Sequence, residues 1–197
     1  MWPLLLITAA CKPRQPSQTT ADHQSPHLAT DICALLSKQE IEVVQGSAIT
    51  DTKSSGESQE MFRLSQCYYS AAESSKSVSL ALTQANPDYK GKRSPKDFWN
   101  ETFGPYDQEK EADRPSANQG ATEGGAKPDK EKEERAAPPR KIEGVGDDAF
   151  WVGNRVGGAL YILKNNAILR ISVGGADNQE TKINKSRALA LKALPRL

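Results

Sequence analysis

Histidine is nearly absent from this chain of 197 residues: only His23 and His27 are present. The rest of the chain therefore cannot form a Ser-His-Asp or Cys-His catalytic arrangement, and cannot bind zinc through histidine. The Ser, Gln and Pro residues around these two disfavour the helix that would bring them together. Three cysteines are too few for a four-cysteine zinc site. We expect no catalysis, no metal and no cofactor.

Neither sign of charge dominates, because 26 basic and 25 acidic residues leave a net charge of +1. General nucleic-acid binding needs an excess of Lys and Arg on one face, so we predict no nucleic-acid partner. Long apolar runs are also lacking, and the longest is far short of a membrane span. A hydrophobic share of 37% predicts one domain of ordinary size with additional tail or linker residues.

The N-terminus has an apolar run over residues 1–10 that ends in small residues and is followed by Cys11. This is the pattern of a secretory signal segment. The small pair before the cysteine resembles the bacterial lipobox, although Thr8 stands where an aliphatic residue is usual. The resemblance implies a diacylglyceryl anchor on the Cys11 sulfur and cleavage before it. Secretion without lipid and a cytosolic location remain as alternatives.

Residues 11–30 are rich in Pro, Ser, Thr and Gln and contain a single Leu. Such a segment buries too little apolar area to offset its ordering entropy, so we predict a flexible tether. The tether would join the membrane anchor to the folded domain, which places the protein in the cell envelope. Lys12 follows Cys11 in place of the Asp that marks inner-membrane retention in some bacteria, which favours the outer membrane.

If Cys11 carries lipid, Cys33 and Cys67 remain as a pair. Export would place them in an oxidising compartment, where a disulfide persists. We therefore predict a Cys33–Cys67 disulfide, worth roughly 4 kcal/mol in the loop-entropy model. Two buried free thiols are the alternative.

Elements of regular structure follow. Ser37 and Glu40 form a capping-box pattern that predicts a helix ending at Gly46. Strand patterns cover residues 61–71 and 77–84, and Ser94 with Pro95 predicts a second helix.

Residues 107–141 contain no large apolar residue, and 17 of these 35 residues are charged. We predict a disordered insertion here, a solvated spacer in preference to a partner-binding segment.

Beyond residue 141, three strands are expected within residues 150–174, with a tight turn at Asn165. A final helix is expected to be capped by Asp177 with Glu180. Residues 31–197 are thus expected to form a single α+β domain, an antiparallel sheet with packed helices.

Two short segments merit a functional interpretation. Residues 144–149 match G-x-G-x-x-A, but a charged linker precedes them and a strand follows, which favours a tight turn over a nucleotide site. Glu143, Asp147 and Asp148 are acidic enough for a weak calcium site or a carboxylate-dependent enzyme. Adjacent residues on a strand point to opposite faces, so Asp147 and Asp148 do not converge by themselves.

A glycine-rich loop at residues 153–158 lies between Trp151 and Tyr161. A hairpin loop is the default interpretation, and a loop that contacts a ligand is the alternative.

Residues 31–41, Asp-Ile-Cys-Ala-Leu-Leu-Ser-Lys-Gln-Glu-Ile, resemble the "D-x-C-x-L-L-T/S-x-x-E-I/V" opening of many uncharacterised bacterial lipoproteins. The spacing to residues 66–69 and 144–150 also fits this group, which includes lipoproteins of actinobacteria. The extracellular sensor domains of bacterial Ser/Thr kinases, with a PsbP-like α+β sandwich, are more distantly similar. The resemblance covers residues 31–197 except the insertion. It implies an exported, disulfide-bridged binding or sensor-like module and brings no catalytic residue.

The sequence therefore predicts a lipid-anchored envelope protein whose domain binds a protein or small-molecule partner without turnover. A carboxylate-dependent enzyme and a cytosolic accessory protein are the alternatives.

Overall fold

The computed structural model describes residues 31–112, 137–153 and 157–197. Cys11, His23 and His27, and with them the predicted signal segment and tether, lie outside the described residues. Most of the predicted insertion and the middle of the 153–158 loop lie outside them too.

The described residues form one seven-stranded sheet in the order β1-β2-β3-β7-β6-β5-β4, with every neighbouring pair antiparallel. This arrangement, with its packed helices, confirms the predicted α+β class. The strands are β1 (Ile49–Ser58), β2 (Phe62–Ala71), β3 (Val78–Ala85), β4 (Arg140–Lys141), β5 (Asp148–Gly153), β6 (Gly158–Lys164) and β7 (Ala167–Val173).

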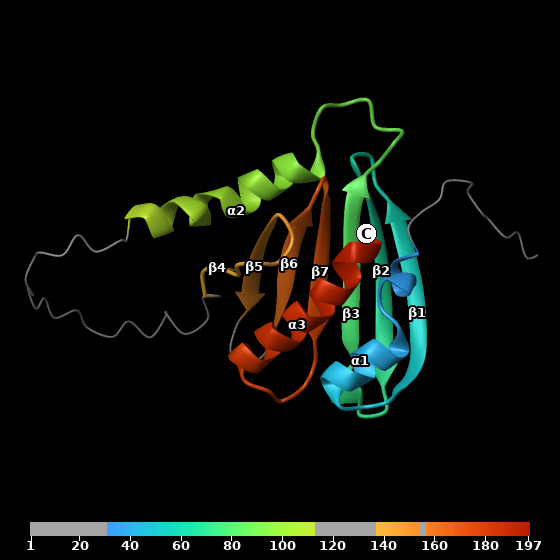
Figure 1. The fold of residues 1–197 in the computed structure, drawn as a ribbon. Coiled ribbons are helices and arrows are strands. Elements are labelled where there is room, and N and C mark those ends of the chain that lie inside the picture. The colour runs from blue at the N-terminus through green and yellow to red at the C-terminus, as the bar shows by residue number, and fades with distance from the viewer. Residues whose placement is uncertain (1–30, 113–136, 154–156) are drawn as a thin grey trace, which may run out of the picture.

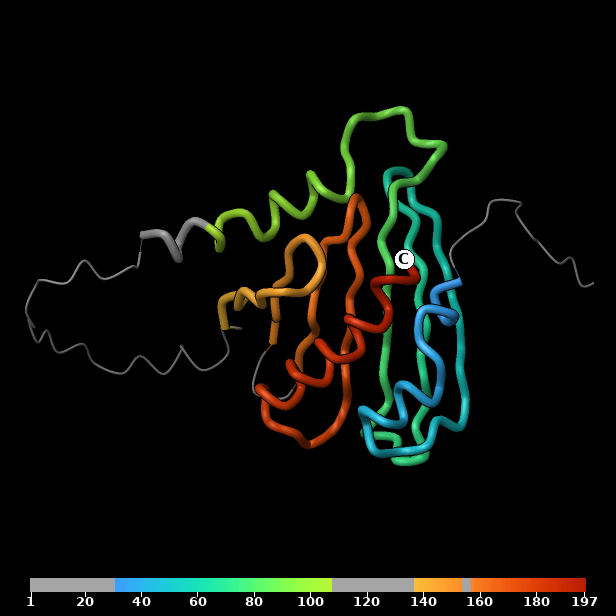
Figure 2. The backbone as a smooth tube through the Cα atoms, in the orientation of Figure 1, coloured from blue at the N-terminus to red at the C-terminus, as the bar shows by residue number. Residues whose placement is uncertain are grey.

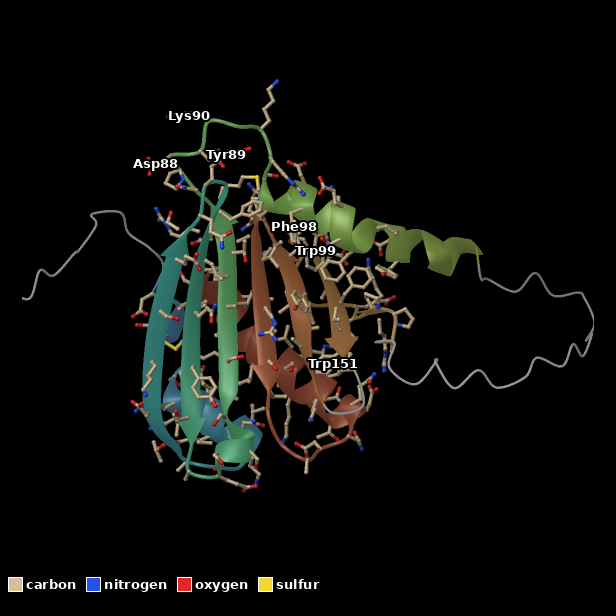
Figure 3. All side chains as sticks on the ribbon, turned by 180° about the vertical axis from the view of Figure 1, so that it is seen from behind. Asp88, Tyr89, Lys90, Phe98, Trp99 and Trp151 are labelled. Carbon is tan, nitrogen blue, oxygen red and sulfur yellow. A yellow bond between two sulfur atoms is a disulfide. The ribbon has the colours of Figure 1, made fainter. Side chains whose placement is uncertain are left out.

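Helices cover the two faces of this sheet unequally. Helix α1 (Lys38–Gln45) and helix α3 (Gln179–Ala193) lie on one face, as Figures 1 and 2 show. Helix α2 (Pro95–Ala112) lies on the other face, over the β5–β7 side (Figure 3). The described residues also include three short 3-10 helices, η1 (Ile32–Leu35), η2 (Ser74–Lys76) and η4 (Leu194–Arg196).

The alternation of side chains along the strands builds two separate cores. On β3, Val78, Leu80 and Leu82 face α1 and α3 and belong to the larger core. A smaller core lies under α2 and consists of Trp99, Phe103, Phe150, Leu163 and Ile168. Because both faces of β5 and β6 are covered, these strands carry apolar residues on both sides, and β7 does so except at Arg170 and Ser172 on the α2 side.

Local signals explain the helix ends. Ser37 and Glu40 form the predicted capping box, and Gly46 ends α1 with a φ of 65°. The predicted cap of α3 is wrong by one residue, because Asn178 accepts the hydrogen bond from the Thr181 N–H at 2.9 Å. Asp177 instead accepts from Lys185 at 2.6 Å, and this hydrogen bond lowers the pKa of Asp177.

Ordered structure enters the predicted 107–141 insertion from both ends. Helix α2 continues to Ala112, because the sequence that follows Pro105 is rich in strong helix formers. At the other end, Arg140 and Lys141 pair with β5 as strand β4.

A disulfide joins Cys33 of η1 to Cys67 of β2, as predicted, across a sequence separation of 34 residues. Nearby, the buried Tyr69 hydroxyl donates to the backbone oxygens of Cys33 at 2.9 Å and of Leu36 at 3.0 Å. Burial raises the pKa of Tyr69 to about 12, so this hydroxyl keeps its proton. The bridge and the tyrosine together hold η1 against the larger core.

Candidate functional site

A cavity of about 530 Å³ lies between α2 and the sheet face that α1 and α3 leave uncovered. We call it the α2 cavity. Figure 3 shows this side of the molecule, with Phe98 and Trp99 between α2 and the strands. The lining residues come from α2, from β2, β3, β5, β6 and β7, and from the segment before β4: Leu64, Gln66, Ser79, Leu80, Ala81, Thr83, Phe98, Thr102, Phe103, Tyr106, Pro139, Val152, Tyr161, Ile168 and Arg170.

Small side chains on β3 leave room for the α2 cavity. Ser79, Ala81 and Thr83 alternate with the large, buried residues of that strand and therefore face α2. The strand register places Ala81 between Gln66 on β2 and Arg170 on β7. The middle of the strand side of the cavity therefore carries a small side chain, and the polar side chains of Gln66 and Arg170 lie on either side of it.

The α2 side of the cavity is aromatic and fixed to the sheet. The Phe103 ring stacks on the Phe150 ring with their centroids 5.0 Å apart. The centroid of the Trp99 ring lies 4.4 Å from that of Phe103. The Trp99 indole N–H donates to the Asp148 carboxylate at 3.0 Å. These contacts hold α2 in one position over β5 and β6.

An ion-pair network at the β4 end also holds α2. Lys141 pairs with Asp107 of α2 and, at 2.8 Å, with Asp148 of β5. Burial works to lower the pKa of Lys141, but the hydrogen bonds to both carboxylates outweigh it, so its pKa lies above the ordinary value. The lysine therefore stays charged and links helix to sheet.

Arg170 and Tyr161 are the polar centre of the α2 cavity. The Arg170 Nε donates to the Tyr161 hydroxyl at 3.2 Å, and the guanidinium carbon lies 5.7 Å from the Tyr161 ring centroid. Arg170 carries the only charge among the cavity residues of the described chain. Gln66, Ser79, Thr83 and Thr102 supply neutral hydrogen-bonding groups around it. The cavity can therefore hold an apolar body and offers one cation to a polar end.

The predicted carboxylate cluster does not converge. Asp147 accepts hydrogen bonds from Lys164 at 3.0 Å and from the Asn165 N–H, and the Lys164 bond lowers the pKa of Asp147. Asp148 instead accepts a hydrogen bond from the Trp99 indole and forms an ion pair with Lys141, on the α2 side of the sheet. Glu143 is exposed. No group of three His, Cys, Asp or Glu side chains suited to a metal occurs in the described residues.

The predicted tight turn is present over residues 144–147, and residues 148 and 149 already belong to β5. Gly144 and Gly146 have φ values of 74° and 66°, and a Cβ at Gly146 would lie 2.5 Å from the Leu163 oxygen. Only glycine fits at Gly146. The segment leads directly into β5 and opens no helix, so its glycines serve the turn.

The two aromatic residues beside the glycine-rich loop lie on opposite faces. Trp151 is buried in the larger core, whereas Tyr161 lines the α2 cavity. Residues 154–156 of the loop lie outside the described residues, so its suggested contact with a ligand stays a prediction. Sequence reasoning missed Arg170, although a single basic residue inside the apolar strand AILRISV is a detectable signal.

Comparisons of the chain with protein-family models, curated proteins and solved structures found no match. Within the part of the chain that the structure describes, none of the helices has the length and apolar character needed to cross a bilayer. The fold and the α2 cavity define an α+β domain with a ligand-sized cavity on one sheet face.

Proposed function

We propose that this chain is a lipid-anchored envelope protein whose folded domain binds a small molecule in the α2 cavity without transforming it. The observation that carries the binding role is the cavity itself. Its volume of about 530 Å³ falls within the range of small-molecule sites, roughly 300–1,000 Å³. Its lining is also typical of such sites, since a mostly apolar wall surrounds a few polar groups.

Binding is favoured over turnover by the chemistry around the cavity. Its lining includes no carboxylate, cysteine or histidine among the described residues. The Asp148 carboxylate of β5, on the α2 side of the sheet, accepts a hydrogen bond from Trp99 and pairs with Lys141. A general acid or base needs a free group within hydrogen-bond reach of the ligand, and these contacts leave Asp148 occupied.

The envelope location is supported by the Cys33–Cys67 disulfide, because structural disulfides persist mainly in oxidising compartments. A lipid on Cys11 would then tether the domain to the membrane, and the outer membrane is favoured. A sensor-like role fits this arrangement, since a tethered binding domain samples its surroundings without being lost by diffusion.

The anchor is tested by metabolic labelling with a palmitate analogue in a bacterium that processes lipoproteins. The wild-type chain should become labelled, and the Cys11→Ser variant should not. Absence of label on the wild type, or equal label on both, would overturn the anchor and leave the secreted and cytosolic alternatives.

The binding role is tested with the neutral apolar fluorophore N-phenyl-1-naphthylamine. We expect the folded domain to enhance its fluorescence, and the Ala81→Phe variant to abolish the enhancement by filling the strand side of the cavity. Ser55→Phe is the matched control, because Ser55 lies in the same cross-strand row but on β1, outside the cavity. Equal fluorescence with both variants would overturn the α2 cavity as the binding site.

A further inference from the structure

Arg170 is unusual for its surroundings. It stands in the middle of β7 between Leu169 and Ile171, which are fully buried on the opposite face. Its own side chain lines the α2 cavity, where it is partly buried. An arginine in this position loses hydration on one side, which a partner of opposite charge would offset.

The protein supplies only part of that compensation. A guanidinium has five N–H donors, and in the described chain only the Nε group of Arg170 has an acceptor, the Tyr161 hydroxyl. Arg93, Arg140 and Arg196 each pair with a glutamate, whereas no ion pair to Arg170 occurs among the described residues. The two terminal nitrogens of Arg170 are therefore available for a fork-shaped contact with an anion.

The neighbourhood favours a single negative charge on an apolar body. Arg170 carries one positive charge, and a carboxylate matches both that charge and the planar geometry of the guanidinium. Around it, Phe98, Phe103, Tyr106 and Ile168 offer apolar and aromatic surface. A ligand with a large polar body would leave these rings against polar groups and lose the gain from apolar burial.

We propose that the α2 cavity binds a monocarboxylate amphiphile, with its carboxylate on the terminal nitrogens of Arg170 and its apolar body under α2. This inference rests on the proposed ligand-binding function and names the ligand class. The Tyr161 hydroxyl accepts from Nε and its ring centroid lies 5.7 Å from the guanidinium carbon, so Tyr161 restrains the Arg170 side chain and leaves its terminal nitrogens for the ligand.

The test compares dodecanoate with dodecan-1-ol and dodecyltrimethylammonium, which share one alkyl chain and differ in head-group charge. Displacement of N-phenyl-1-naphthylamine is measured at pH 8 and at concentrations below micelle formation. We expect dodecanoate to bind at least tenfold more tightly than dodecan-1-ol, in line with a hydrogen-bonded contact between charged groups. The cationic amphiphile should bind more weakly than the alcohol.

Variants then assign the effect to one side chain. Arg170→Gln should remove the preference for dodecanoate and keep the affinity for dodecan-1-ol. Arg63→Gln is the matched control. Arg63 lies on β2 of the same sheet, but it alternates with the cavity residue Leu64 and so faces away from the cavity. The Arg63→Gln variant should keep the full preference.

The outcomes separate the inference from the proposed function. Equal affinity of the wild type for all three amphiphiles overturns the role of Arg170 and leaves the cavity as a neutral apolar site. A preference for dodecanoate that survives Arg170→Gln also overturns it. If neither the fluorophore nor any amphiphile binds, the proposed binding function itself fails. The charge series needs only wild-type protein, so an unstable variant does not block the test.

Discussion

Single side chains connect distant parts of this domain, and Glu40 is the clearest case. Its carboxylate completes the capping box of α1 and also accepts two hydrogen bonds from Arg196 of η4, both at 2.8 Å. The Arg196 bonds, helped by the Ser37 backbone N–H, lower the pKa of Glu40 from 4.5 to about 2. Arg196 also donates to the Leu35 oxygen at 2.9 Å, so one ion pair joins η1, α1 and η4.

The Glu40 contacts predict a defined dependence of stability on pH. Because the pKa of Glu40 is lower in the folded state, its contribution is complete above about pH 4.5 and is lost as pH falls toward 2. At pH 7, Glu40→Gln should lower the free energy of unfolding by about 1 kcal/mol, the scale of a partly exposed ion pair. Urea unfolding at pH 7, 4 and 2.5 should show this difference shrinking with acidity.

The control for Glu40 is Glu57→Gln, since Glu57 is exposed on β1 and forms no ion pair with the described residues. It should change stability little at any pH. A Glu40→Gln deficit that stays constant down to pH 2.5 would contradict the ion-pair explanation.

At the scale of elements, the sequence predicts those whose signals are local. The cap of α1, the start of α2 at Pro95 and the turn at Asn165, with a φ of 53°, depend on residues a few positions apart. Strands β2 and β3 were predicted from apolar alternation. These elements are confirmed because their stabilising contacts lie within the segment itself or follow from its periodicity.

Strand β1 was not predicted, because it lacks that signal. Its sequence, ITDTKSSGES, is polar, and nearly all of it is exposed at the edge of the sheet. It is a strand because β2 supplies backbone partners along its whole length, from Ile49 opposite Ala71 to Ser58 opposite Arg63. Polar and charged edge residues also limit pairing with other chains, which fits an edge position.

The α2 cavity, like β1, has no local sequence signal from which it could be predicted. The sequence predicted helix α2 and the strands beneath it, and Tyr161 was noted for its neighbouring loop. The cavity depends on small residues of β3 lying beside Arg170 of β7, which are about ninety positions apart in the chain. Strand order and register set that proximity, and neither is encoded in a local pattern.

At the scale of the whole molecule, the two sheet faces have separate tasks. The face under α1 and α3 holds the larger core and the disulfide, whereas the face under α2 holds the smaller core and the cavity. The Cys33–Cys67 bridge therefore stabilises the fold from the side opposite to the proposed ligand. This separation predicts that stability and ligand affinity respond differently to reduction of the disulfide.

Reduction should cost the domain about 4 kcal/mol of unfolding free energy, because the bridge closes a loop of 34 residues in the unfolded chain. That is a large share of the 5–15 kcal/mol typical of a domain. The measurement is urea unfolding of a Cys11→Ser protein with and without a phosphine reductant, followed by fluorophore titration of the reduced protein that remains folded. The affinity of the α2 cavity should stay within about twofold, since neither cysteine lines it. A loss of affinity in parallel with the loss of stability would show that the two faces form one cooperative unit, and would contradict their independence.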